Sequence, residues 1–125
     1  MTATGSMTLS GNVTNLPGSE TFGPFVHTIS NVVGQISTIS LSSGANTVTV
    51  PSGTTRIVVV GPNMASPSPN PSYGGTLTIK GVSGDTGIAV SAGSFVSWGY
   101  DSVVTAPSTF VINASTSTSV QIWFW

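Results

Sequence analysis

The stretch "TTRIVVVG", residues 54–61, decides the fold of this chain. It contains the four consecutive apolar residues from Ile57 to Val60, and branched residues of this kind favour a pleated sheet. A short run that is apolar on both faces, instead of alternating with polar residues, is typical of a strand buried on both sides. We therefore expect this stretch to form a central strand of the core.

Other runs of β-forming residues lie on both sides of this strand, and Gly, Pro, Ser or Asn bounds each of them. Their spacing of about ten residues is the pattern of a β-sandwich or a jelly roll. We therefore predict an all-β protein, an antiparallel β-sandwich or jelly roll of about 9–10 short strands. The spacing does not distinguish the two topologies. The flanking runs are "TLSGNVT", "PFVHTIS", "GQISTISL", "NTVTVPSG", "GGTLTIKG", "GIAVSAG", "SFVSWGY", "STFVINAS" and "TSVQIWFW".

Alternation of apolar and polar residues predicts which face of three of these runs meets the core. Val48 and Val50 share one face of their run, and Leu77 and Ile79 share one face of theirs. The last run turns Val120, Ile122 and Phe124 to one side and Gln121, Trp123 and Trp125 to the other.

The composition limits the classes of partner. Charged residues make up 4% of the 125 residues and the net charge is −1, whereas Ser and Thr together number 39. Nucleic-acid binding needs clustered Lys and Arg, so we expect none. No apolar run is long enough to span a bilayer, and the N-terminus does not resemble a signal peptide, so we expect a protein made in the cytoplasm without membrane contact. With no cysteine there is no disulfide or thiolate site.

A nearly uncharged surface promotes association, which points to a protein that works in an assembly. We expect residues 1–8 to form an N-terminal arm that lies on a neighbouring subunit, and residues 9–125 to form a single β-sandwich domain. The loop "PNMASPSPNPSYGG", residues 62–75, contains four prolines and is expected to lie extended over a surface, as a connector or a partner-ordered segment.

The stretch "TLTIKGVSGDTGIAV", residues 76–90, contains a glycine-rich loop and an Asp-Thr-Gly sequence. A nucleotide-binding loop needs a lysine after its last glycine, but Lys80 precedes the glycines. Retroviral-type aspartic proteases carry apolar residues just before the aspartate, where this chain has Ser83 and Gly84. We expect instead a structural hairpin in which glycines supply positive φ angles and an aspartate accepts backbone N–H bonds. Its residues are Lys80, Gly81, Gly84, Asp85 and Gly87.

Acid–base chemistry would have to use one histidine, three carboxylates and two cations. Alternation in "PFVHTIS" puts His27 on the face opposite Val26, and we expect it to be an ordinary strand residue. We predict no enzymatic activity, no catalytic residues, no cofactor and no metal site.

A carbohydrate-binding module is the alternative to a purely structural protein. Aromatic residues can present flat apolar faces to a sugar ring, although core or interface packing also accounts for them. The candidate residues for a subunit interface or a glycan contact are Trp98, Tyr100, Trp123 and Trp125.

The glycine-rich hairpin, together with the valine-rich strand and proline-containing loop before it, resembles a segment of small structural proteins of tailed bacteriophages. The resemblance covers about a third of the chain and follows an "LT-L/I-KG-V-x-GDTG-I" pattern. The matching residues are Leu77, Thr78, Ile79, Lys80, Gly81, Val82, Gly84, Asp85, Thr86, Gly87 and Ile88.

This resemblance implies a virion component without catalysis, located in the head or the tail. We expect a capsid decoration or cement protein that stabilises the shell through subunit contacts, with a tail- or baseplate-associated protein as the alternative. Its expected partners are further copies of itself, as a homotrimer, and other virion subunits such as the major capsid protein.

Overall fold

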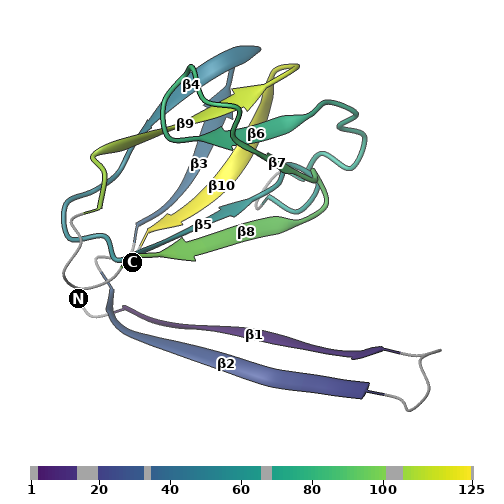
Figure 1. Cartoon of the computed structure of the whole chain (residues 1–125), viewed down its shortest axis with the longest axis vertical. Helices are drawn as coiled ribbons and strands as arrows, with labels where there is room; N and C mark the ends of the chain where they lie inside the picture. Colours follow the sequence, from purple (N-terminus) through teal and green to yellow (C-terminus); the bar gives the residue numbers. More distant parts are fainter. Residues whose placement is uncertain (1–2, 14–19, 33–34, 66–68, 101–105, 125) are drawn as a thin grey trace. The chain divides into compact units, whose positions relative to one another are not determined.

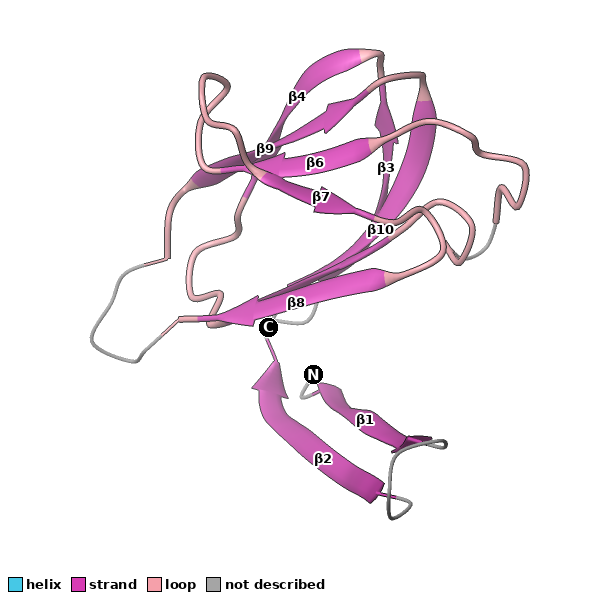
Figure 2. Ribbon diagram, turned by 45° about the vertical axis from the view of Figure 1, so that its right-hand side comes forward, coloured by secondary structure: helices cyan, strands magenta, loops and turns pink. Residues whose placement is uncertain are grey.

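The computed structural model describes residues 3–13, 20–32, 35–65, 69–100 and 106–124. Within these ranges the chain forms ten β-strands and no helix, so the predicted all-β class is confirmed (Figure 2). The chain divides into two compact units, Met1–Val33 and Gly34–Trp125.

The second unit is a sandwich of two four-stranded antiparallel sheets (Figure 1). One sheet has the order β3-β10-β5-β8 and the other has the order β4-β9-β6-β7. The strands are β3 (Gln35–Leu41), β4 (Gly44–Thr49), β5 (Arg56–Val60), β6 (Leu77–Lys80), β7 (Ile88–Val90), β8 (Phe95–Gly99), β9 (Thr109–Ala114) and β10 (Thr118–Phe124).

The pairing of these strands defines a jelly roll, one of the two topologies that the sequence leaves open. The first strand of the sandwich pairs with the last, and each following strand pairs with one nearer the middle: β3 with β10, β4 with β9, β5 with β8, and β6 with β7. This nesting is a long hairpin wrapped around a core, which is the eight-stranded jelly-roll arrangement.

The core lies between the two sheets, and the alternation in the sequence fills it as predicted. Val120, Ile122 and Phe124 of β10 are buried, whereas Gln121 and Trp123 between them are only half-buried. Val48 of β4 and Leu77 of β6 are also buried in the core. Burial of an apolar side chain of this size stabilises the folded state by about 1.5–3 kcal/mol.

The valine-rich stretch forms β5, an interior strand between β10 and β8. Ile57 and Val59 belong to the core cluster, and Val58 and Val60 on the opposite face are buried as well. The prediction of a central strand that is buried on both faces is therefore confirmed.

The first unit is a two-stranded ribbon in which β1 (Ala3–Val13) pairs antiparallel with β2 (Glu20–Val32). β1 thus continues past residue 8, which is the predicted end of the N-terminal arm. The division observed at residues 33 and 34 differs from the expected one at residues 8 and 9, because residues 20–32 pair with residues 3–13 and not with the sandwich.

The proline-containing loop differs from the extended surface segment that the sequence predicts. Among its described residues, Pro62 and Ala65 are buried, and the Asn70 N–H donates to the Pro62 carbonyl at 2.7 Å. Tyr73 packs into the core, with its hydroxyl 3.3 Å from the Thr116 carbonyl. The loop folds back on itself because these apolar side chains gain more from burial than from lying over the surface.

Candidate functional site

The β6–β7 hairpin is the structural hairpin that the sequence predicts, and it is closed by its aspartate. The Val82 N–H donates to the Asp85 carboxylate at 3.0 Å, and the Asp85 N–H donates to the Val82 carbonyl at 3.1 Å. The Lys80 ammonium lies 3.4 Å from the Ser83 carbonyl. The expected role of Asp85, which is to accept a backbone N–H inside the turn, is confirmed.

The expected backbone conformation of the hairpin glycines is confirmed only at Gly87, which has a φ of 75°. Gly81 and Gly84 do not have positive φ, so that part of the prediction is wrong. The physical reason is that the hydrogen bonds between Val82 and Asp85 turn the chain there without a left-handed residue.

Removal of the Asp85 carboxylate should loosen this turn. We expect Asp85→Ala to lower the free energy of unfolding by about 0.5–1 kcal/mol, the contribution of one solvent-exposed hydrogen bond. Asp85→Asn keeps an acceptor oxygen and should lose less. Urea denaturation followed by tryptophan fluorescence measures both variants, and an equal loss in the two would show that the acceptor is not what stabilises the turn.

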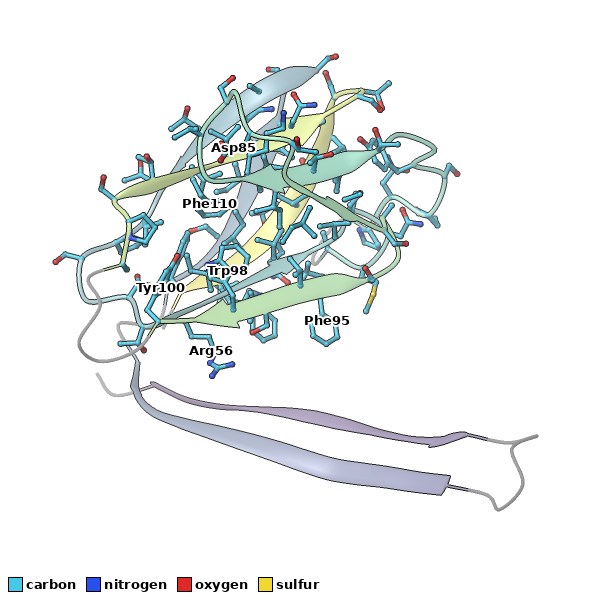
Figure 3. All side chains as sticks on the ribbon, in the orientation of Figure 1. Arg56, Asp85, Phe95, Trp98, Tyr100 and Phe110 are labelled. Carbon is cyan, nitrogen blue, oxygen red and sulfur yellow. The ribbon has the colours of Figure 1, made fainter. Side chains whose placement is uncertain are left out.

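An aromatic cluster lies beneath this hairpin (Figure 3). The Trp98 indole N–H donates to the Tyr100 hydroxyl at 2.8 Å. The Trp98 ring meets the Phe110 ring edge to face, with centroids 5.4 Å apart and planes at 89°. Phe110 is buried, whereas Trp98 and Tyr100 are half-buried. The hydrogen bond and the ring contact fix the orientation of all three rings.

The hairpin and the aromatic cluster line an open groove of about 620 Å³ between the two sheets. Its walls are mainly apolar, and Lys80 and Asp85 are the charged residues among the described residues that line it. A groove of this size with few polar groups has the character of a small-ligand site. The complete lining is Ile79, Lys80, Gly81, Asp85, Gly87, Ile88, Val96, Ser97, Trp98, Tyr100, Pro107, Thr109 and Phe110.

The groove brings together residues of two sets that the sequence predicts separately, namely the structural hairpin and the candidate interface or glycan contacts. Lys80, Gly81, Asp85 and Gly87 of the hairpin lie on the same groove as Trp98 and Tyr100. Gly84 is not part of the lining. Sequence reasoning missed the contribution of Phe110, because it becomes a groove residue only when β9 pairs with β6. The apolar run "TFVIN" around it indicates burial and nothing more.

Trp123 belongs to a different surface from Trp98. It pairs with Ile36 of β3 on one side and with Val58 of β5 on the other, on the outer face of their sheet. On the same face, Phe95 pairs with Val60. Ile36 is 62% exposed and Phe95 is 43% exposed. Of the remaining predicted contact residues, Trp125 lies outside the described residues.

The groove offers few polar groups. Its described lining contributes one carboxylate, one ammonium and several hydroxyls, but neither histidine nor cysteine. Within the described part of the chain, no cluster of three or more histidine, cysteine or acidic residues could hold a metal ion. The same residues include no helix that is long and apolar enough to cross a membrane.

Comparison of the chain with protein families, with characterised proteins and with solved structures finds no match. The function is therefore inferred from the fold, the ribbon and the groove.

Proposed function

We propose that this chain is a non-enzymatic structural protein of a tailed-bacteriophage particle, in the form of a homotrimeric decoration subunit that stabilises the capsid through contacts with the shell. The observation that carries the proposal is the β1–β2 ribbon, which forms a compact unit separate from the jelly roll. The resemblance of the β6–β7 hairpin to phage structural proteins is the reason for proposing a phage particle as the assembly.

The residue pattern of the ribbon is that of a contact segment. In its register, Leu9 is opposite Phe25 and Gly5 is opposite Ile29, whereas Ser6 is opposite Thr28. Pairs two positions apart along a ladder belong to the same face of a ribbon, so most apolar positions share one face. Glu20 and His27 also fall on that face, and Val26 falls on the other. Positions on the apolar face are Ala3, Gly5, Met7, Leu9, Gly11, Val13, Glu20, Phe22, Phe25, His27, Ile29 and Val32.

Two irregularities in the register preserve this arrangement. The pairing shifts between Ala3 and Gly5 and again between Leu9 and Gly11. Each shift inserts one extra residue in β2, which brings Phe22 and Val32 into phase with the apolar positions. Without the shifts, these two residues would fall on the polar face, because a slip of one residue exchanges the faces of a strand.

A two-stranded ribbon with one apolar face needs a surface to cover that face. Isolated hairpins are at best marginally stable in water, because they bury too little apolar area. In the proposed particle, contact with shell proteins and with neighbouring copies buries this face. The outer face of the β3-β10-β5-β8 sheet, with Ile36 and Phe95 exposed, offers a second apolar surface for such contacts.

The composition fits an assembly of this kind. Only five charged residues occur in the chain, so little charge has to be desolvated when its surface is buried. An interface of about 1,600 Å² per contact, repeated over a shell, would resist internal pressure without an active site.

Proteomic analysis of gradient-purified particles from cells that carry the gene tests this proposal. We expect the full chain to sediment with particles that contain filled heads. A chain from which residues 1–33 are deleted should remain in the free protein fraction, because it lacks the ribbon. The core cluster of the residues whose burial is described lies in the second unit, so we expect the truncated chain to fold. Recovery of the full chain only as free protein would contradict a virion role, and its recovery with isolated tails would contradict decoration of the head.

A further inference from the structure

We propose that the groove between the β6–β7 hairpin and β8 is a binding site for a neutral saccharide. The inference is independent of the proposed structural role, because it uses only residues of the jelly roll and does not require the ribbon. Three properties of the groove lead to it: the arrangement of its aromatic rings, the balance of its charges, and the position of its exposed apolar wall.

The aromatic rings present carbon surface to the groove. The Trp98 indole N–H, which is the polar group of this side chain, is already bound to the Tyr100 hydroxyl at 2.8 Å. Trp98 therefore offers its ring and not a donor. Phe110 supports it from beneath at a centroid distance of 5.4 Å. Rings held in this way can pack against the C–H face of a pyranose without the cost of ordering them on binding.

The polar groups of the groove suit hydroxyls. Only one Asp85 oxygen accepts the Val82 N–H, so the carboxylate retains further acceptor capacity. The Tyr100 hydroxyl accepts from Trp98 and still has its own proton to donate. Lys80 can donate up to three hydrogen bonds. Acceptors and donors thus lie beside apolar rings, which matches a sugar that has an apolar face and a rim of hydroxyls.

The charges select a neutral ligand. Among the described residues that line the groove, one ammonium and one carboxylate are present, so they contribute no net charge. An anionic ligand would be attracted by Lys80 but repelled by Asp85, and a cationic ligand would meet the opposite arrangement. A neutral saccharide can form hydrogen bonds with both residues and is repelled by neither.

The third property is the exposed wall. Ile88 of β7 lines the groove although 68% of the residue is exposed. Val82 on the same hairpin is 63% exposed but does not line the groove. The two residues therefore make a matched pair, because a charge placed at either is solvated and should leave the fold intact, but only one of the two positions touches a ligand in the groove.

The test is isothermal titration of the full chain with neutral hexasaccharides of glucose, mannose, galactose and N-acetylglucosamine. We expect at least one of them to bind, and Ile88→Glu to weaken that binding by about tenfold or more. Val82→Glu should change the affinity by less than about twofold. Tyr100→Phe should weaken binding but not abolish it, because it removes only the hydroxyl.

Three outcomes would overturn the proposal. They are the absence of binding of every neutral hexasaccharide at millimolar concentration, equal effects of Ile88→Glu and Val82→Glu, and tighter binding of a heparin-derived hexasaccharide or of the tripeptide Ala-Trp-Ala than of any neutral sugar. None of these outcomes bears on particle association, so failure of the saccharide site and failure of the virion role are distinguishable.

Discussion

Replacement of Ile122 by alanine is expected to lower the free energy of unfolding by about 3–4 kcal/mol, a large part of the stability of a domain of this size. Ile122 has 0% exposure and lies in β10, which pairs with both β3 and β5. The truncation removes buried methylene and methyl groups and leaves a cavity that strands held on both sides cannot close. Few single substitutions in the jelly roll should cost more.

Urea denaturation measures this loss, and tryptophan fluorescence reports on the jelly roll alone because Trp98, Trp123 and Trp125 all belong to the second unit. Ile36→Ala is the matched control, since it removes the same atoms from the adjacent strand β3 at a residue that is 62% exposed. We expect the control to cost less than about 1 kcal/mol. Similar losses for the two variants would contradict the placement of the core.

The second large effect is expected for Gly87→Ala. Gly87 has a φ of 75°, and an added Cβ would lie 2.5 Å from the Ile79 carbonyl oxygen. A left-handed conformation costs an L-residue about 1–2 kcal/mol, and the clash with backbone adds to it. We therefore expect a loss of about 2–4 kcal/mol, together with a displaced hairpin and weaker saccharide binding.

Gly84→Ala is the control for this substitution on the same turn. Gly84 does not have positive φ, and an added Cβ would meet no atom within 4 Å. Its replacement should change stability by no more than about 1 kcal/mol, with either sign, because alanine also reduces the freedom of the unfolded chain. If both variants lost the same stability, the conformation of Gly87 would not be what holds the hairpin.

Much of the fold could be predicted because the sequence alternates cleanly. Residues 57–60 identified the interior strand, and Val120, Ile122 and Phe124 identified the buried side of the last strand. The jelly-roll topology could not be predicted in this way. Period-two alternation shows which face of a strand is buried but not which strand lies beside it. β3 and β10, for example, are paired although they are the first and the last strand of the sandwich in sequence.

The same limit explains the position of the domain division. The strands at residues 3–13 and 20–32 have the same short-range pattern as those of the jelly roll, and nothing local shows that they pair only with each other. The prolines of residues 62–75 predict an extended surface loop. The burial of Tyr73 could not be predicted, because it depends on segments that are distant in the sequence.

The groove could be predicted only in parts. Lys80, Gly81, Asp85 and Gly87 were singled out by turn chemistry, and Trp98 and Tyr100 by residue type. Their convergence depends on β6 and β8 lying in facing sheets, which is a property of the topology. Residue type alone groups Trp123 with Trp98, but the pairing of Trp123 with Ile36 and Val58 places it on the outer face of the same sheet that contains Trp98.

We propose that the N-terminal ribbon brings copies of this chain together. Light scattering of the purified protein, with and without residues 1–33, tests it most directly. We expect the full chain to have three times the mass of one 12.6 kDa chain and the truncated chain to be a folded monomer. A full chain that is monomeric at every concentration, or a truncated chain that remains a trimer, would contradict this role of the ribbon.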